Sequence, residues 1–331
     1  MRLKTGKLPP EILAAFTKTL NFPSNLIVEP GVGEDAAVIV DGNRNLVVAS
    51  DPITFVSDRA GYYAVVVNAN DVAATGAEPE FFFAVVLLRA GAQCSEAEHI
   101  LTDIATTCTE MNICLAGGHT EITHDLPMTV ICGTCIGWTA RPLPSRGVRE
   151  GDLILQVRPI PLEAISILAR ERHDSLVKKV GSHAVEEAKA VLLNPGISVV
   201  DEARILAANE GVHALHDVTE GGIAGGLWEI SRAAGVQLNI DRETILIHPL
   251  WEKTGAQFNL PVMETIGSGC LLASIDPDYL EETGKILTDR GMPWSVIGHA
   301  SQGEGVRMNG KEFPCPERDA ITALWESEPI E

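Results

Sequence analysis

Apolar residues recur at helical spacing in three stretches of the first third of the chain. Residues 9–20, PPEILAAFTKTL, begin with prolines, which fit the first turn of a helix. Residues 59–77, RAGYYAVVVNANDVAATGA, are apolar on nearly every side, which predicts a long and largely buried helix ending near Gly76. Residues 95–111 start with a Ser-x-x-Glu capping box and predict a third helix.

Shorter apolar runs that lie between turn residues predict strands. Residues 36–40 and 45–50 would pair through the turn DGNR. The runs FFFAVVLL at 81–88 and MTVICGTCIGW at 128–138 contain few polar residues, and this favours buried strands.

The stretch RPLPSRG at 141–147 interrupts the apolar pattern with prolines, a glycine and arginines. Such a composition predicts a domain boundary, with one domain over residues 1–145 and a second over 146–331. Beyond the boundary, the pattern predicts strands at 152–157, 212–216, 269–275 and 294–298 and a hairpin at 306–313. It also predicts helices at 161–172, 183–193, 197–210 and 222–234, one helix after Pro277 and a final helix. Strands and helices are mixed in both halves, so we expect one α/β domain and one α+β domain.

Charge and cysteine content narrow the class of protein. The 331 residues carry a formal net charge of −20, which argues against non-specific binding to nucleic acid or to an anionic membrane surface. No stretch of about 18 uncharged apolar residues is present, so no membrane span is expected. The start, MRLKTGKLPP, has no apolar run after its basic residues, so no signal peptide is expected. The seven cysteines have no spacing typical of a disulfide framework, which favours a reducing cytoplasm.

Cys132 and Cys135 form a CxxC pair, for which there are two interpretations. One is a metal or redox site. The other is a strand, in which residues three apart lie on opposite faces. No second CxxC follows to complete a four-cysteine zinc site, so we favour the strand.

The motif GVGEDAA contains Gly31, Gly33 and Ala36 at the spacing GxGxxA of dinucleotide-binding loops. That function needs a helix directly after the glycines, so that phosphate meets the helix N-terminus. Here AAVIVDGNR follows, which predicts a strand and a turn. A dinucleotide site is therefore not expected, and no Walker-type GxxxxGK[ST] loop is present.

Polar residues also interrupt apolar segments at five places, four of which are predicted strand or turn ends. The residues concerned are Asp35 in GVGEDAA, Asp51 in SDPIT, Asn68 and Asp71 in NANDVAATGA, His119, Thr120 and Glu121 in the predicted loop GGHTEIT, and Asp217, Thr219 and Glu220 in HDVTEGG. Taken singly, each has a structural interpretation, such as a turn at Asp51, a tight turn at GGHT or a helix N-cap at Asp217 or Thr219. Together they favour side chains presented to one cleft.

Carboxylates in such a cleft would suit Mg²⁺, which takes oxygen ligands and commonly binds one or two carboxylates together with substrate phosphates. None of the five clusters contains a lysine or an arginine. A site of this kind must offset the charge of a nucleoside triphosphate with metal ions. We therefore expect Mg²⁺ on the carboxylates, with the polyphosphate held by Mg²⁺ and by N–H groups near the glycines.

In this order, GVGEDAA, SDPIT, NANDVAATGAEP, AGGHTEI and HDVTEGGIAGGLWEI resemble the aminoimidazole-ribonucleotide synthetase (PurM)-like superfamily over about residues 31–300. The resemblance implies an N-terminal α/β domain, a C-terminal α+β domain, and a homodimer with strands of both N-terminal domains in a central barrel. It also implies ATP and Mg²⁺ in a cleft between the domains, close to the dimer interface. It assigns metal binding to Asp35, Asp51, Asp71 and Asp217, and cofactor binding to Gly33, Asp35, Asn68, Gly117, Gly118, His119, Thr120, Asp217 and Thr219.

Among the subfamilies, the sequence is most similar to the hydrogenase expression/formation protein HypE type. Three features depart from that type. Its terminal cysteine is absent, since this chain ends WESEPIE and its last cysteine is Cys315. Residues 119–121 replace an Asp-Thr-Lys-like stretch, and Ser268 stands where that type has a glutamate.

The resemblance implies an ATP- and Mg²⁺-dependent enzyme that phosphorylates an amide-type or acid group supplied in trans, on a small molecule or a protein, with a link to hydrogenase or metalloenzyme maturation. It leaves open whether dehydration of the phosphorylated group follows. The departures keep open a non-catalytic nucleotide-binding partner and a small-molecule kinase. No catalytic residue is assigned.

Overall fold

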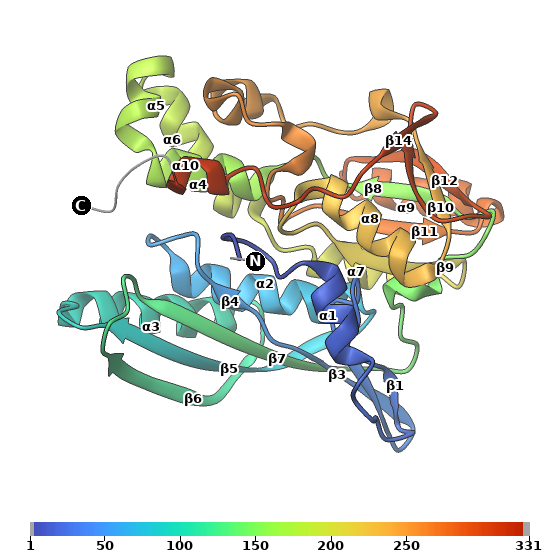
Figure 1. The fold of residues 1–331 in the computed structure, drawn as a ribbon, viewed down its shortest axis with the longest axis horizontal. Coiled ribbons are helices and arrows are strands. Elements are labelled where there is room, and N and C mark those ends of the chain that lie inside the picture. The colour runs from blue at the N-terminus through green and yellow to red at the C-terminus, as the bar shows by residue number, and fades with distance from the viewer. Residues whose placement is uncertain (1–2, 327–331) are drawn as a thin grey trace.

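The structure is a computed structural model and describes residues 3–326. It contains two seven-stranded mixed sheets, one in each half of the chain (Figure 1). The first sheet has the order β1-β2-β3-β7-β5-β6, with β4 paired to β7. Its strands are β1 Leu26–Val28, β2 Ala37–Asp41, β3 Arg44–Ala49, β4 Pro52–Ile53, β5 Glu78–Arg89, β6 Cys114–Thr123 and β7 Val130–Thr139.

The second sheet has the order β14-β13-β10-β12-β8-β11-β9. Its strands are β8 Leu153–Val157, β9 Val212–Asp217, β10 Gln237–Ile240, β11 Leu271–Ile275, β12 Trp294–Ser301, β13 Gly305–Met308 and β14 Lys311–Phe313. The prediction of a two-domain fold with mixed strands and helices in both halves is confirmed. The exact division at residues 145 and 146 stays a prediction.

The helices are α1 Pro10–Thr17, α2 Ala60–Ala74, α3 Cys94–Glu110, α4 Leu162–Glu171, α5 His173–Val180, α6 Ser182–Ala190, α7 Val200–Ala207, α8 Gly222–Ala234, α9 Leu280–Asp289 and α10 Thr322–Glu326. The sequence pattern missed β1, β4, β10 and α5, which are short. The predicted capping box is wrong, because α3 begins at Cys94 and its N-cap residue Gln93 makes no side-chain capping bond. No helix within residues 3–326 is long and apolar enough to cross a membrane.

Helix α2 is the central element of the molecule. All fifteen of its residues are buried, as predicted. The helix contacts β7 and β5 of the first sheet on one side, and α7 and β9 of the second half on the other. Because both halves cover it, α2 can be apolar around its whole circumference. A polar side chain on α2 is therefore held rigidly between the two domains.

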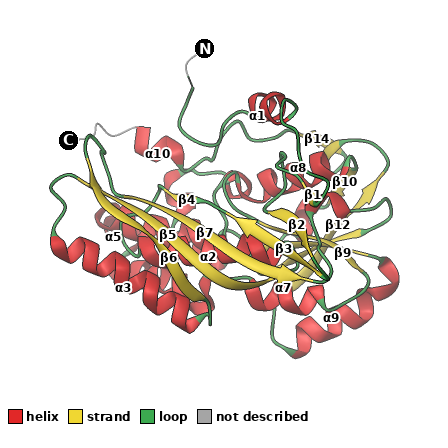
Figure 2. Ribbon diagram, turned by 90° about the horizontal axis from the view of Figure 1, so that it is seen from below, coloured by secondary structure: helices red, strands yellow, loops and turns green. Residues whose placement is uncertain are grey.

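The strands β5 and β7 are only half-buried, which corrects the expectation of fully buried strands. In β5, Phe82, Ala84 and Val86 are buried, whereas Phe83 and Val85 are 36% and 38% exposed. One face of the sheet packs against α2, and in the view from below β5, β6 and β7 lie in front of that helix (Figure 2). An uninterrupted apolar run in the sequence fits two kinds of strand, one that is buried on both faces and one whose second apolar face is exposed. The sequence pattern alone therefore does not distinguish them.

The segment GGHTEIT is a strand and not the predicted loop. It forms the second part of β6, which pairs in parallel with β5 as far as Thr123 and is exposed along nearly its whole length. Gly118 has φ +148°, and a Cβ there would lie 1.9 Å from the Ala84 carbonyl oxygen. This glycine is needed for the close approach of β6 to β5.

The structure confirms the strand interpretation of the CxxC pair. Along β7, residues alternate between partly buried and buried, so Cys132 and Cys135 lie on opposite faces of the sheet. Both thiols are free. The two cysteines do not form a common metal or redox site.

Candidate functional site

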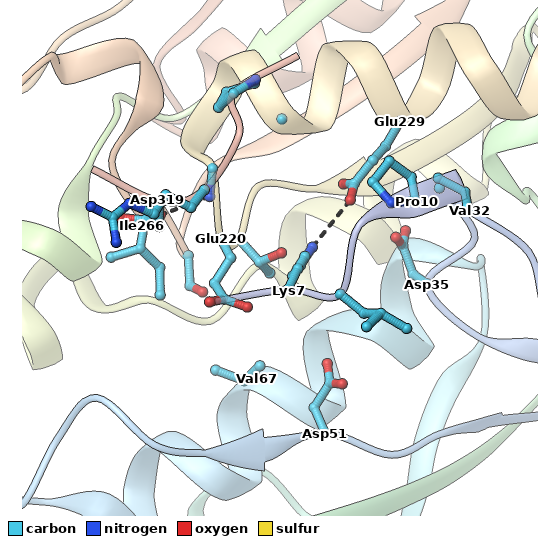
Figure 3. Close-up of a pocket in the computed structure, with 18 of the residues that line it drawn as sticks. Lys7, Pro10, Val32, Asp35, Asp51, Val67, Glu220, Glu229, Ile266 and Asp319 are labelled. Carbon is cyan, nitrogen blue, oxygen red and sulfur yellow. Dashed lines mark hydrogen bonds and ion pairs between the residues drawn. The ribbon is translucent and has the colours of Figure 1, made fainter. Parts of the chain in front are cut away.

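A cleft of about 450 Å³ lies between the two halves of the molecule (Figure 3). Its floor comes from the first half, through residues 51–56 and one face of α2. Its opposite wall comes from the first turn of α4, the start of α8 and residues 266–268. The chain segments 7–13 and 315–319 also line it. Segments far apart in the sequence therefore meet in one hollow.

Three residues of α2 face this cleft, namely Tyr63, Val67 and Asp71. They are spaced four apart and so share one face of the helix. The α-helical rise of 1.5 Å per residue separates Tyr63 from Asp71 by about 12 Å. The cleft thus has an acidic end at Asp71 and another end at Tyr63.

Four predicted carboxylates converge at the acidic end. Asp35, Asp51 and Asp71 line the cleft, and Asp217 is buried at the end of β9 with 1% exposure. Burial raises the pKa of Asp71 well above its ordinary value, and repulsion from Asp217, Asp51 and Asp35 raises it further. Burial, with the nearby charge of Asp35, also raises the pKa of Asp217 to about 8. The charges of the neighbouring acids therefore oppose the ionisation of Asp71.

Two oxygens of this cluster have no hydrogen-bond partner among residues 3–326. The Oδ2 atoms of Asp71 and Asp217 are buried and unpaired. A buried acceptor without a donor costs free energy, so an ion or ligand that met these oxygens would be stabilised. Within residues 3–326, no three His, Cys, Asp or Glu side chains are arranged to hold a metal ion by themselves. The cluster therefore suits Mg²⁺ that arrives with phosphate and water ligands, rather than a metal enclosed by protein.

Asn68 does not line the cleft but fixes the position of Asp51. Its Oδ1 accepts a hydrogen bond from the Asp51 N–H at 2.8 Å, and its Nδ2 donates to the Asp51 and Ala64 carbonyls at 3.3 and 2.9 Å. The side chain is fully buried. A Cβ at Gly133 would lie 2.3 Å from the Asn68 Nδ2, so the glycine between the two cysteines of β7 makes room for this amide.

His216 connects Asp35 to the second half of the molecule. Its Nδ1 lies 2.9 Å from the Asp35 Oδ1, and its Nε2 lies 3.3 Å from the Glu229 Oε2. Burial acts to lower the pKa of His216, but the two carboxylates outweigh it and the pKa stands well above its ordinary value. A buried imidazolium therefore holds Asp35 in place. The motif HDVTEGG contained this residue, but the sequence did not show that it would meet an acid from residue 35.

Basic side chains do reach the cleft, which corrects the expectation of a site without them. Lys7 and Arg318 both line it. The Lys7 Nζ lies 3.1 Å from the Glu229 Oε1, as the dashed line in Figure 3 marks, and its side chain is 50% exposed. Burial acts to lower the pKa of Lys7, yet Glu229 and Glu220 raise it above its ordinary value. These residues come from segments near the two ends of the chain, outside every motif.

The glycine of GVGEDAA that matters sterically is Gly33. It has φ +87°, and a Cβ there would lie 2.3 Å from the carbonyl oxygen of Glu229 in α8. The loop must pass this close to α8 for Asp35 to reach His216. Gly33 is thus required by the contact between the two halves of the molecule, whether or not its N–H also meets a phosphate.

The start of α8 is not capped by Asp217 or Thr219, so that structural alternative is wrong. Its N-cap residue is Gly221, whose N–H donates to the Asp319 Oδ2 at 2.7 Å. Burial raises the pKa of Asp319 to about 7. Thr219 lines the cleft nearby. The C-terminal segment therefore supplies an anion to this helix end.

Asn68 and Asp217 are buried without lining the cleft, and four further predicted binding residues lie outside it. They are Gly117, Gly118, His119 and Thr120, all on the exposed strand β6. The His119 Nε2 lies 3.2 Å from the Glu121 Oε2, and the His119 side chain is 65% exposed. Cys315, in contrast, lines the cleft, but burial raises the pKa of its thiol to about 11, which makes it a weak nucleophile at neutral pH.

Comparison with known families agrees with this architecture. Residues 33–139 match the N-terminal domain of AIR synthase related proteins, and residues 149–311 match the C-terminal domain. The chain belongs to the AIR synthase related family. The resemblance read from the five motifs is thereby confirmed.

Relatives of several activities are similar to this member of the family. The carbamoyl dehydratase HypE of Cupriavidus necator is 25% identical over 263 residues, which cover 77% of this chain and 68% of the relative. The selenide, water dikinase of Dechloromonas aromatica is 26% identical over 327 residues, covering 89% of this chain and 90% of the relative. At this level of identity, family membership does not distinguish one reaction from another.

Solved structures show the same fold. "AaThiL complexed with AMPPCP and TMP" superposes with a TM-score of 0.76 at 19% identity, over 96% of this chain and 98% of that chain. A hydrogenase maturation protein HypE in complex with ATP superposes with a TM-score of 0.71 at 18% identity, over 92% of this chain and 90% of that chain. These likenesses support the two-domain fold.

Proposed function

We propose that this family member is an ATP- and Mg²⁺-dependent enzyme that transfers a phosphoryl group to an amide-type or acid acceptor supplied in trans. The observation that carries the proposal is the meeting of Asp35, Asp51, Asp71 and Asp217 at one end of the interdomain cleft, with unpaired buried oxygens on two of them. Similarity to a protein solved with ATP and to one solved with AMPPCP adds support.

The residues of the site would divide the work between metal binding and positioning. Asp35, Asp51, Asp71 and Asp217 would hold Mg²⁺, which when bound neutralises phosphate charge. The buried Asn68 amide fixes the backbone of Asp51, and His216 fixes the carboxylate of Asp35. Rigid placement of this kind favours phosphoryl transfer, which depends mainly on positioning and charge stabilisation.

Lys7 is the cation placed to meet the negative charge of a polyphosphate. Its ammonium group is half-exposed in the cleft and already paired with Glu229. A phosphate that entered the cleft would compete with Glu229 for this group. We propose that Lys7 exchanges Glu229 for a phosphate oxygen when nucleotide binds.

The homodimer remains part of the proposal and rests on the edge strand β6. This strand is ten residues long and exposed, and Ile122 on it is 73% exposed. Long exposed edges of this kind are usually protected by another chain or element. In a dimer formed there, Gly117, Gly118, His119 and Thr120 would contribute to nucleotide binding only if the second copy brought them to a cleft.

Titration calorimetry with ATP tests the proposal. We expect ATP to bind in the presence of Mg²⁺ and to bind at least tenfold more weakly in EDTA, because the carboxylates repel an unaccompanied triphosphate. Asp71→Asn should abolish the Mg²⁺ dependence, whereas Asp289→Asn on the surface of α9 should not. Metal-independent binding, or no binding of ATP, would contradict the proposal.

Two alternatives stay open for this cleft. The departures at Glu121 and Ser268 favour a nucleotide-binding partner without turnover, since they alter positions that the HypE type fills with other chemistry. Steady release of ADP that is lost in Asp71→Asn would eliminate that alternative. A small-molecule kinase is the other, and a link to metalloenzyme maturation is a proposal that rests on the HypE relatives alone.

A further inference from the structure

The end of the cleft away from the metal carboxylates contains a buried acid, Glu163. It lies in the first turn of α4, lines the cleft and is only 4% exposed. Its Oε2 accepts a hydrogen bond from the Ser268 N–H at 3.0 Å. Ser268 also acts on this carboxylate through its side chain, and both interactions favour the ionised form of Glu163.

Helix α2 places Glu163 at the Tyr63 end of the cleft. The Tyr63 hydroxyl lies 3.3 Å from the Ser166 Oγ, which is one turn along α4 from Glu163. Asp71 is about 12 Å further along α2, by the helical rise. Glu163 faces the same hollow as Asp71, and the charged neighbour that acts on it is Glu220 and not one of the four aspartates.

Among residues 3–326, no cationic side chain is paired with Glu163. Burial raises its pKa to about 7, with Glu220 adding to the rise against the hydrogen bonds from Ser268. A carboxyl group buried without a counter-charge is expensive to ionise. In a cleft open to ligands, the missing counter-charge can be supplied by what binds there.

The surroundings of Glu163 indicate what such a ligand would resemble. Phe55, Val56 and Ile266 line the cleft with apolar surface. Binding sites commonly combine apolar walls with a few placed polar groups that fix orientation. A flat or apolar body that ends in a cationic nitrogen would satisfy both the walls and the carboxylate.

We propose that Glu163 recognises the phosphate acceptor through a cationic nitrogen, an amine or an amidine, carried at the end of the acceptor remote from the atom that is phosphorylated. This inference rests on the proposed function in one respect, because it takes the ligand to be the phosphate acceptor. Binding of a cationic nitrogen by Glu163 does not depend on the proposed function.

Benzamidine, compared with its neutral isostere benzamide, is the probe that tests this inference. Both would be titrated into the full-length protein by calorimetry, with Mg²⁺ and the non-hydrolysable analogue AMPPCP present. We expect benzamidine to bind and benzamide to bind at least tenfold more weakly. Equal affinity for the two compounds, or no binding of benzamidine, would overturn the inference without any variant being made.

Glu163→Gln keeps the size of the side chain and removes its charge. We expect the variant to lose at least tenfold in benzamidine affinity, while Glu281→Gln, an exposed charge change on α9, leaves it unchanged. Unchanged affinity in Glu163→Gln would refute the role of this carboxylate. Titration of Mg²⁺ and ATP on the same samples reports separately on the proposed function. Glu163 is not one of the four proposed metal ligands, so its replacement should leave nucleotide affinity within twofold.

Discussion

Replacement of Asp217 by asparagine should stabilise the protein while it removes a metal ligand. Asp217 is 1% exposed, and its Oδ2 has no hydrogen-bond partner. Its pKa is about 8, compared with an ordinary value of 3.8, so the folded protein resists its ionisation. An asparagine at this position is neutral and can donate hydrogen bonds towards the neighbouring carboxylates.

The expected size of the effect follows from this pKa. At 1.36 kcal/mol per pH unit, the difference corresponds to at most about 6 kcal/mol of lost stability at pH values above 8. Relaxation and water entry reduce such values, so we expect Asp217→Asn to gain about 2 to 4 kcal/mol near pH 8. Because the pKa is raised on folding, the stability that Asp217 contributes is complete below about pH 4 and is lost as the pH rises towards 8. The gain of the variant over the wild type should therefore widen with pH.

Urea unfolding at pH 5.5, 6.5 and 7.5, in EDTA and without nucleotide, measures this gain. The free energy of unfolding of Asp217→Asn should exceed that of the wild type by an amount that rises with pH. Asp289→Asn, an exposed change on α9, serves as the control and should show no such rise. If the difference in the free energy of unfolding between Asp217→Asn and the wild type stayed constant or decreased with rising pH, the reasoning about the buried acid cluster would be refuted.

Three further changes test other parts of the structure. Asn68→Ala removes the amide that satisfies the backbone of Asp51, so the free energy of unfolding in urea should fall by about 2 to 4 kcal/mol, and a loss below about 0.5 kcal/mol would contradict this role. Gly33→Ala should be destabilising by at least about 2 kcal/mol more than Gly42→Ala. Both glycines have positive φ, but only a Cβ at residue 33 would contact another segment of backbone. Equal shifts in the thermal unfolding temperature of the two variants would disprove that contact. Ile122→Lys on the β6 edge should convert a dimer to a monomer in light scattering, while Leu101→Lys on α3 should not, and a dimer that survives the first change would exclude this edge as the interface.

The sequence was sufficient to predict structure and site residues where acidic residues lie within or beside apolar segments. The continuous apolar character of residues 59–77 predicted a buried helix, and the acids within or beside apolar segments predicted a shared cleft. Asp35, Asp51 and Asp71 do line one cleft, and Asp217 lies buried next to them. These predictions succeeded because an acid is rarely placed in an apolar helix or at a strand end without a partner or a ligand.

The sequence pattern was insufficient to predict a segment's structure or its place in the cleft where these depend on solvent exposure or on contacts with distant residues. GGHTEIT was expected to be a loop because its glycines and polar residues are typical of turns, but pairing with β5 makes it an edge strand. Lys7, Glu163 and Glu229 belong to no motif, and only the folding of remote segments onto the cleft brings them to it.

By itself, the sequence determined the family, the two domains with strands and helices in each, and the set of carboxylates, because these depend on local periodicity and on the order of short motifs. Only the tertiary structure decided which polar groups share the cleft, that a histidine lies between Asp35 and Glu229, and that two aspartate oxygens are left without partners. Those properties arise from distances between residues more than a hundred positions apart, such as Asp35 and His216, and no local pattern of polar and apolar residues encodes such distances.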